Sequence, residues 1–409
     1  MGVRQIRCPW AHADHSSLDH KMSRLRILHT IPSLARVHGG PTRALLMMEA
    51  VLSGIAEITI LTTDDDGPGR RLAKSIQVAP GDRAKRVYVR KWFEFYKIAP
   101  GLVPWLLRHV NCFDVVHIHA LFSFSSVASA LIARLRGVPY VVRPLGTLAN
   151  YGISQRRPLL KRLSLAFIEG PILRHAAALH FTSESERDEA RALGVPIRCV
   201  VIPLGIDAGE WPVHKEHTTG SELRILFLSR LDPKKNLESL FQAFALLDRT
   251  TIQARLTVAG SGSADYTARL HGVADRLGIS DRVDWLGHIE GVQKAEVLAR
   301  AEVFVLPSRS ENFGIAAAEA MLAGVPCVLS RGVAIASDAE AAGAAVVIEP
   351  EPEAIADALR GILAARPQAQ ELGARGRKFA QREYSAATMG LRLAALYSDI
   401  KAGRLPERA

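Results

Sequence analysis

The chain has little cysteine and no long apolar segment. Its 409 residues include four cysteines, with no CxxC pair, so neither a zinc site nor a disulfide framework is predicted. No apolar run reaches the roughly 18 residues that a membrane-spanning helix requires. Helix-turn-helix, RRM, KH and zinc-finger signatures are also missing, which argues against nucleic acid as a partner. These absences favour a cytoplasmic protein in a reducing compartment.

The first 22 residues differ from the rest of the chain. They contain no apolar core and no small-residue cleavage site, so they do not resemble a secretory signal. His12, His15 and His20 lie there, and a metal-binding tract is one interpretation. A disordered extension that precedes the compact segment from Met22 is the favoured one.

The charge balance is strongly basic. A formal net charge of +11 attracts anionic partners. Without a nucleic-acid motif, the remaining candidates are sugar phosphates and the surface of an anionic membrane.

The length and the pattern predict two α/β domains. Short β-branched runs alternate with helical stretches, which is typical of βαβ units and parallel sheets. We therefore expect two Rossmann-like, doubly wound domains that face each other across a cleft, with ligands outside the carboxyl ends of the strands. The expected boundaries are an extension at 1–22, a first domain at 23–203, a linker at 204–222, a nucleotide-sugar domain at 223–375, and helices at 376–409 that could cross back to the first domain. The expected strands are Arg26–His29, Glu57–Thr62, Asp114–Ile118, Tyr140–Arg143, Ala178–Thr182, Arg224–Ser229, Ala254–Ala259, Val283–Gly287, Val303–Leu306, Cys327–Leu329 and Ala345–Ile348.

The sharpest signal is the segment VFVLPSRSENFGIAAAEAMLAGVP in the second half. A buried strand ends in a polar turn, and a helix of strong formers then begins near Gly314. The unpaired amides of Phe313, Gly314 and Ile315 predict an anion- and hydroxyl-binding helix end. Glu311 and Glu319 flank that end, and carboxylates accept paired hydrogen bonds from vicinal diols. The alternatives are a dipole-complementing Glu311 and a Glu319 that is only a helix former.

Two cations follow the first strand of this half, in the segment FLSRLDPKKNLESL. Arg230 and Lys235 at a strand-to-helix turn would neutralise a pyrophosphate, and Lys234 competes with Lys235 for that role. The next strand runs into Gly260 and Gly262. A GxG pattern is weak alone and often only a tight turn, but behind a strand it suits close approach to phosphate or ribose.

In this order, the motifs S-R-x-D-P-x-K-N, V-x-G-x-G and E-N-F-G-I-x-x-x-E-A-M-x-x-G-x-P resemble the retaining GT-B glycosyltransferases of family GT4, over nearly the whole chain from about Arg24. The resemblance implies that Arg230 and Lys235 hold the donor diphosphate. It also implies that Glu311 engages the donor sugar, that Glu319 binds ribose, and that the Ile289 backbone lies against the base. The donor-binding set that it implies is Gly39, Gly40, Gly260, Gly262, Ile289, Asn312, Phe313, Gly314, Ile315 and Glu319.

The first half carries a weaker set. Gly39 and Gly40 precede a helix that starts near Pro41, where a backbone could approach a phosphate; an ordinary strand–helix loop is the alternative. His117 and His119 share one face of a strand by the period of two. Family likeness makes His119 the catalytic candidate beside the transferred sugar, whereas a structural histidine pair is the other option. The segment RPLG has Leu145 where relatives often have histidine.

No metal or other cofactor is expected. Asp64 and Asp66 follow a strand of the first half and are interpreted as a solvated loop. Arg230, Lys235 and the helix end could stabilise a departing nucleotide diphosphate by themselves.

A non-catalytic carbohydrate- or lipid-binding protein and a Rossmann dehydrogenase are the alternatives to a glycosyltransferase. The dehydrogenase is disfavoured because GSGSAD lacks a third glycine.

Two segments also suggest contact with the inner face of the plasma membrane. RRPLLKRLSLAFIEGPILRH at 156–175 combines basic and apolar residues, and KWFEFYKIAPGLVPWLLRHV at 91–110 adds aromatic ones. Basic residues beside exposed aromatics suit an anionic bilayer. The equally weighted alternative is that these apolar residues belong to the core.

Overall fold

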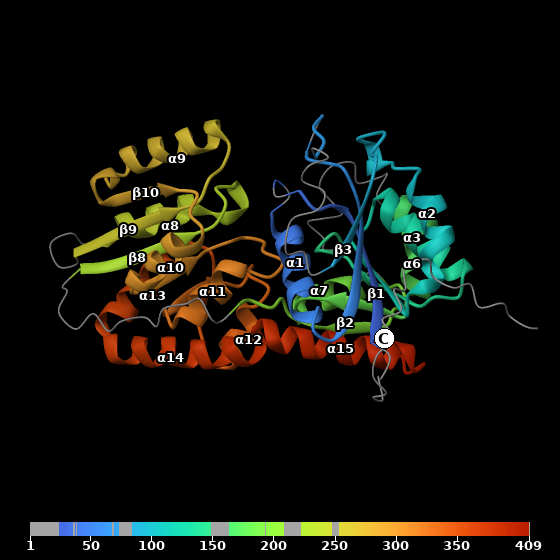
Figure 1. Cartoon of the computed structure of the whole chain (residues 1–409). Helices are drawn as coiled ribbons and strands as arrows, with labels where there is room; N and C mark the ends of the chain where they lie inside the picture. The colour runs from blue at the N-terminus through green and yellow to red at the C-terminus, as the bar shows by residue number, and fades with distance from the viewer. Residues whose placement is uncertain are drawn as a thin grey trace, which may run out of the picture. The chain divides into compact units, whose positions relative to one another are not determined.

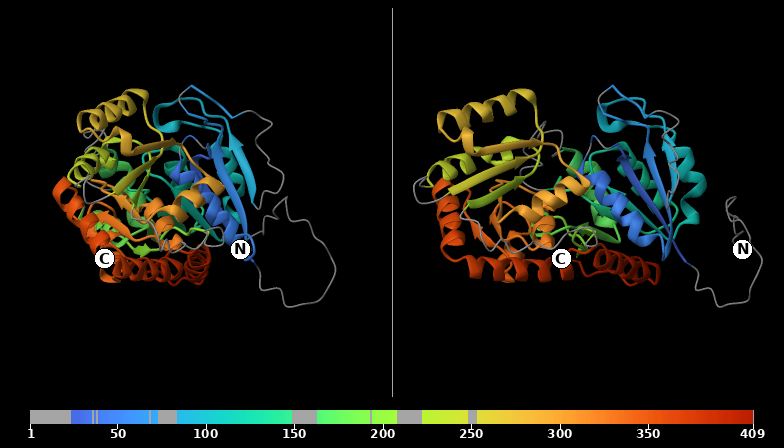
Figure 2. Two further views of the ribbon diagram at one scale, coloured as in Figure 1. Left: turned by 90° about the vertical axis from the view of Figure 1, so that its left-hand side faces the viewer. Right: turned by 60° about the vertical axis from the view of Figure 1, so that its left-hand side comes forward.

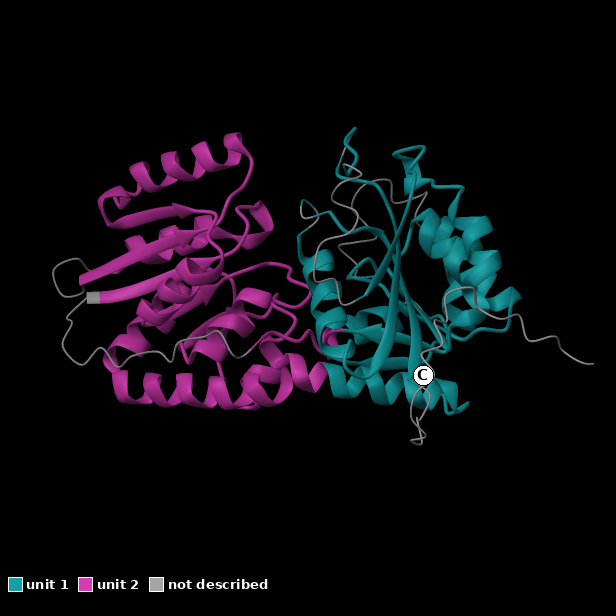
Figure 3. Ribbon diagram, in the orientation of Figure 1, with its two compact units in different colours: residues 1–181, 186–202, 390–409 teal, residues 182–185, 203–389 magenta. Residues whose placement is uncertain are grey.

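The computed structural model describes two compact units. The described residues are 24–408 except 36, 38, 68, 73–83, 149–162, 193, 208–221 and 248–252. The predicted N-terminal extension and most of the predicted linker therefore lie outside them. The first unit comprises Met1–Phe181, Glu186–Ile202 and Gly390–Ala409, and the second comprises Thr182–Ser185 and Pro203–Met389 (Figure 3).

The first unit is built on a seven-stranded sheet in the order β3-β2-β1-β4-β5-β6-β7, with parallel neighbours throughout. Figure 1 labels its strands β1, β2 and β3. Its strands are β1 Leu25–Ser33, β2 Ala56–Thr63, β3 Lys85–Val89, β4 Val115–His119, β5 Tyr140–Arg143, β6 Ala178–Phe181 and β7 Cys199–Val201. Its longer helices are α1 Gly40–Leu52, α2 Leu102–His109, α3 Phe124–Leu135, α6 Gly170–His175 and α7 Glu184–Arg191. Central strands such as β4 are buried throughout, as expected for a sheet covered on both faces.

The second unit has a six-stranded parallel sheet in the order β10-β9-β8-β11-β12-β13. Figure 2 shows the strands and helices of the chain from two further sides. This is the order 3-2-1-4-5-6 of a dinucleotide-binding fold. Its strands are β8 Glu222–Leu228, β9 Gln253–Ala259, β10 Val283–Gly287, β11 Val303–Leu306, β12 Cys327–Ser330 and β13 Val346–Ile348. Its helices are α8 Leu237–Ala245, α9 Ala264–Arg276, α10 Gly291–Arg300, α11 Ile315–Ala323, α12 Ala336–Ala341, α13 Pro352–Ala364 and α14 Arg366–Glu383, and α15 Ala386–Lys401 continues into the first unit.

The predicted α/β class with two Rossmann-like sheets is confirmed, and every predicted strand is present. Strands β3 and β7 were missed because both are edge strands, one with charged residues and one of three residues. The C-terminal helical region begins at Arg366 rather than near Gly376, since Pro367 occupies the first turn of α14. Among the described residues, none of the helices has the length and apolar character needed to cross a membrane.

Two other expectations are corrected. Asp65, in the loop interpreted as solvated, is fully buried because Lys91 and Lys97 pair with its carboxylate. Cys112 is disulfide-bonded, whereas Cys199 and Cys327 are free thiols. The scattered spacing of four cysteines carried no signal for that bond.

Candidate functional site

The strand order of each sheet reverses beside its first strand, between β1 and β4 in one unit and between β8 and β11 in the other. Ligands of such sheets bind outside the carboxyl ends of the strands at this reversal. His119 is the last residue of β4, Arg230 follows β8, and Glu311 follows β11. The sequence-predicted residues thus lie at the two places where topology favours a ligand.

Lys235 and Glu311 meet in the second unit. Lys235 ends a 3-10 turn, Pro233–Lys235, that Asp232 caps by accepting the Lys234 amide at 3.0 Å. The Lys235 side chain is buried, and its Nζ contacts the Glu311 carboxylate. Asn236 is left-handed at φ 58° and redirects the chain into α8. The turn therefore brings Lys235 inward, to the carboxylate predicted to engage a sugar.

The neighbouring cations shape the electrostatics of this turn. Burial, with Lys234 and Arg230 close by, lowers the pKa of Lys235 to about 7, because a desolvated ammonium beside like charges is disfavoured. The nearby Asp232 carboxylate opposes that shift. Burial also lowers the pKa of Lys234. A crowded set of cations with one carboxylate suits a ligand that brings further negative charge, such as a diphosphate.

Helix α11 starts beside this pair without a side-chain cap. Gly314, at φ 93°, precedes it, and a Cβ there would lie 2.9 Å from Val333 Cγ1. The Glu311 amide donates to the Gly332 carbonyl at 2.8 Å, which fixes the turn. Asn312 is exposed, Ile315 is half-buried, and the Phe313 ring is buried edge-on against Tyr384. An uncapped amide end next to Lys235 and Glu311 is a ready site for an anion.

Glu319 lies on a buried face of α11, among the Ala and Leu residues that surround it in the sequence. It is 2% exposed, and its Oε1 accepts from Lys294 Nζ of α10 at 2.7 Å. A buried carboxylate paired with a buried ammonium is costly to separate. Lys294 was not singled out from the sequence, because one lysine on an amphipathic helix gives no signal.

Gly260 and Gly262 have a packing reason to be glycine. A Cβ at Gly260 would lie 1.8 Å from the Ser229 carbonyl oxygen, and one at Gly262 would lie 2.3 Å from that of Leu231. The two loops are also hydrogen-bonded, since the Leu231 amide donates to Ser261 at 2.9 Å. These glycines therefore hold the backbone on both sides of Arg230, which is itself exposed. Ile289 follows β10 and its side chain is buried.

Gly39 and Gly40 lie at the start of α1 in the first unit. Gly39 has φ 65° and caps the helix without a side-chain hydrogen bond, and Pro41 occupies its first turn. Added Cβ atoms at Gly39 and Gly40 would meet nothing within 4 Å. Only the conformation of Gly39 requires glycine, and the space beside both residues leaves the amide end open.

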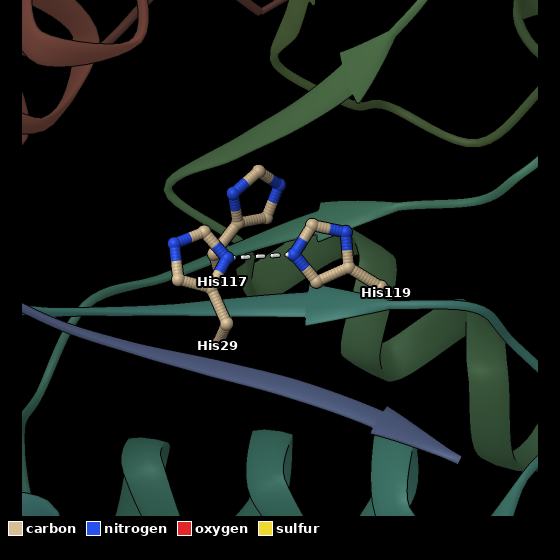
Figure 4. A group of neighbouring side chains, drawn as sticks. All are labelled: His29, His117 and His119. Carbon is tan, nitrogen blue, oxygen red and sulfur yellow. Dashed lines mark hydrogen bonds between the residues drawn. The ribbon is translucent and has the colours of Figure 1, made fainter. Parts of the chain in front are cut away.

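His119 belongs to a buried histidine cluster. His29 of β1 pairs in register with His117 of β4, and His119 pairs with Arg143 of β5. Figure 4 shows His29 and His119 side by side, with His29 Nδ1 2.8 Å from His119 Nε2. Ring nitrogens of His29, His117 and His119 all lie within 4.8 Å of one another. Burial lowers the pKa of His119 well below its ordinary value, with Arg143 adding to the shift, so the cluster is neutral at physiological pH.

The backbone after β4 and β5 is conformationally unusual. Ala120, Phe122 and Leu145 adopt positive φ of 96°, 53° and 59° without being glycine. Such conformations cost about 1–3 kcal/mol each and concentrate at functional sites. Gly146, next in the second turn, donates its amide to Glu186 at 2.7 Å. Both turns lie beside the predicted site residue His119 and its register partner Arg143.

Family models match both halves of the chain. The model "Glycosyl transferase 4-like domain" matches residues 38–205, and "Glycosyl transferases group 1" matches residues 211–379. Among curated proteins, the chain is 32% identical over 225 residues to glycogen synthase of Mycobacterium tuberculosis, which covers 53% of this chain and 52% of that protein. It is 31% identical over 195 residues to a GDP-mannose-dependent phosphatidylinositol dimannoside mannosyltransferase of the same species, covering 46% and 49%. The chain thus spans about half the length of the curated relatives it matches.

Solved structures show the same fold. Sucrose-phosphate synthase of Thermosynechococcus elongatus superposes with a TM-score of 0.73 at 20% identity, covering 93% of this chain and all of that one. Anabaena HepE in complex with UDP gives 0.73 at 19% identity, covering 92% and 100%. With the two family models and the two parallel sheets, these likenesses establish that the chain belongs to the GT4-type glycosyltransferases of the GT-B fold.

Proposed function

We propose that the chain is a retaining glycosyltransferase that moves a sugar from a nucleotide-diphosphate sugar to a glycan or lipid-linked acceptor. One observation carries the proposal: the buried contact of Lys235 with Glu311, beside Arg230 and the uncapped end of α11. Cations, a carboxylate and helix amides at one sheet reversal match the phosphates and hydroxyls of such a donor.

In the proposed reaction the bond between the anomeric carbon and the β-phosphate oxygen breaks while the acceptor oxygen bonds to the same face of that carbon. Arg230 and Lys235 stabilise the charge that develops on the leaving diphosphate, since fixed charges in a desolvated site need no reorganisation. Glu311 accepts hydrogen bonds from the sugar, and the leaving phosphate takes the acceptor proton. Retention is inherited from the family.

The acceptor class rests on chemistry and on relatives. The mannosyltransferase named above acts, by its name, on a phosphatidylinositol mannoside, and a structural neighbour with a TM-score of 0.63 is described as a glycosyltransferase of lipopolysaccharide biosynthesis. A basic chain with a formal net charge of +11 is suited to acceptors that carry phosphate or lie at an anionic surface.

The donor is tested by nucleotide release from UDP-, GDP- and ADP-sugars, with and without EDTA. We expect one donor class to be consumed at the same rate in both, because Arg230, Lys235 and the α11 amides supply the positive charge. Loss of turnover in EDTA that Mg²⁺ or Mn²⁺ restores would contradict the metal-free mechanism.

Calorimetry tests the two alternative functions. A non-catalytic binding protein would bind a nucleotide diphosphate without turnover, whereas a dehydrogenase would bind only a nicotinamide dinucleotide.

The proposed membrane partner is supported by exposed apolar side chains in the two segments singled out from the sequence. Trp92 and Phe167 are 60% and 76% exposed. The segments adjoin, because Tyr96 Oη donates to Glu169 at 2.6 Å. Part of the second segment, 156–162, lies outside the described residues. The exposed large apolar residues of the two segments are Trp92, Phe93, Phe95, Leu107, Leu163, Phe167 and Ile168.

Replacing Trp92, Phe95 and Phe167 together by serine is expected to reduce co-sedimentation with anionic vesicles severalfold, since each aromatic contributes apolar area at the bilayer interface. Leu135, which is 75% exposed on α3, serves as the matched control, and Leu135→Ser should sediment like the wild type. Binding of the wild type should fall with added salt. Equal recovery on neutral and anionic vesicles, or none on either, would contradict the membrane proposal.

A further inference from the structure

Four histidines of the first unit form a buried polar row, and family likeness accounts only for His119. His29, His117, His119 and His180 come from three strands and are each at most 1% exposed. Burial lowers the pKa of His29 and of His180 to about 3, with Arg143 adding to both shifts. Each ring is therefore neutral and carries one proton, so a hydrogen bond to a group that can only accept fixes its tautomer.

One hydrogen-bonded chain runs through His117 and His180. The Ile202 carbonyl can only accept, so His180 Nε2, 2.8 Å away, carries the proton and Nδ1 is an acceptor. His117 Nε2 then donates to that Nδ1 at 3.4 Å. This leaves His117 Nδ1 to accept from Tyr397 Oη of α15 at 2.7 Å. The direction of every bond in this chain is determined, and none of them involves His119.

His29 and His119 form a separate pair. Their one hydrogen bond joins His29 Nδ1 to His119 Nε2 at 2.8 Å. The outer nitrogens, His29 Nε2 and His119 Nδ1, have no hydrogen-bond partner among the residues that the structure describes, and neither have Nε and Nη1 of Arg143. A buried polar atom without a partner costs about 1–3 kcal/mol, which a ligand that bonds to it would offset.

The same rings do not have the spacing of a metal site. Two nitrogens bound to one tetrahedral ion at about 2.0–2.1 Å lie about 3.3 Å apart, whereas the 2.8 Å between His29 and His119 suits a hydrogen bond. Arg143 pairs in register with His119, and its charge opposes a divalent cation.

We propose that His29 is a positioning residue, which through its bond to Nε2 holds the His119 ring in one orientation and leaves His119 Nδ1 for a donor-sugar hydroxyl. The inference rests on the proposed function, because His119 is the candidate that would touch the sugar. His29 supplies the only hydrogen bond to His119 among the described residues, so no other hydrogen bond there orients the ring.

The test compares three variants of the full chain. His29→Leu removes the bond, His29→Asn retains an amide near the Nδ1 position, and Tyr397→Phe perturbs the same cluster without touching His119. We expect His29→Leu to lower kcat about tenfold, as losing one buried hydrogen bond would, while KM for the donor changes little. His29→Asn should recover most of kcat, and Tyr397→Phe should keep it. In ¹⁵N-histidine spectra, the His119 Nε2 resonance should shift in His29→Leu, because that nitrogen loses its hydrogen-bond partner, and should stay unchanged in Tyr397→Phe.

The outcomes separate this proposal from the proposed function. If His119→Ala is inactive but His29→Leu keeps both kcat and the His119 Nε2 resonance of the wild type, the positioning role is wrong while the function stands. If His29→Leu shifts that resonance but His119→Ala turns over normally, then His119 does not touch the sugar. Stoichiometric binding of Co²⁺ or Zn²⁺ to the wild type that His29→Leu abolishes would overturn the proposal, because those nitrogens would then be ligands.

Discussion

Lys235→Ala is expected to lower kcat/KM about a hundredfold. Removing one well-placed donor to developing charge typically costs about 3 kcal/mol in the transition state, and Lys235 is 4% exposed and directed at Glu311. The measurement is steady-state nucleotide release with the identified donor. Lys235→Met keeps most of the side-chain volume and should lose the same activity, which separates lost charge from a cavity.

Lys234→Ala is the matched control, because Lys234 precedes Lys235 in the same turn and is only half-buried. Near-normal turnover of Lys234→Ala is expected. A damaging Lys234→Ala with a silent Lys235→Ala would mean that the other lysine holds the diphosphate.

The pH dependence of donor binding follows from the same residue. In the protein without bound donor, the pKa of Lys235 is lowered to about 7. A bound diphosphate favours the ammonium form of this side chain. Binding above pH 7 should therefore take up a proton, and affinity should fall as pH rises from 7 to 9. The fall should be absent in Lys235→Ala. Calorimetry in buffers of different ionisation enthalpy measures the proton uptake.

Glu319→Ala is expected to abolish transfer, and its stability must be measured alongside. The carboxylate is the predicted ribose ligand, but it also pairs with buried Lys294 at 2.7 Å. Removing one partner of a buried ion pair costs about 3–5 kcal/mol, because the other charge stays in the interior. Thermal unfolding should therefore report a large loss of stability in Glu319→Ala.

The double variant Glu319→Leu/Lys294→Met separates the two effects. Replacing both partners of a buried pair by apolar residues is often neutral or stabilising, so this variant should fold normally and remain inactive. Wild-type turnover in the folded double variant would rule out the role of Glu319 in donor binding.

The sequence predicted the fold because its strands are short apolar runs bounded by turn residues. The helix at Ile315–Ala323 was placed correctly, since Gly314 and Gly324 bound a run of strong helix formers. The edge strand Lys85–Val89 was missed because it is only partly buried and begins with two charged residues. Such a strand shows neither an apolar run nor a clear alternation.

The sequence brought out candidate site residues but not all of their contacts. Motif order singled out Arg230, Lys235 and Glu311, whose roles remain predictions. The ion-pair partner of Glu319 could not be predicted, because Lys294 becomes its neighbour only when α10 packs on α11. The contact of His29 with His119 could not be predicted for a similar reason. A single histidine in an apolar strand gives no sign of its neighbours until the register of β1 with β4 is known.

The loops after β8, β9 and β10 are joined to one another by main-chain atoms. The Leu231 amide donates to Ser261 at 2.9 Å, and the Gly260 amide donates to Gly287 at 2.6 Å. Side chains at intervening positions such as Ser261 and His288 are exposed and take no part in these main-chain bonds. A mutant library that leaves the glycines intact and randomises these two positions would vary the lining of the loops without loosening their framework. If these loops bind the donor as proposed, such a library would change which nucleotide or sugar is accepted.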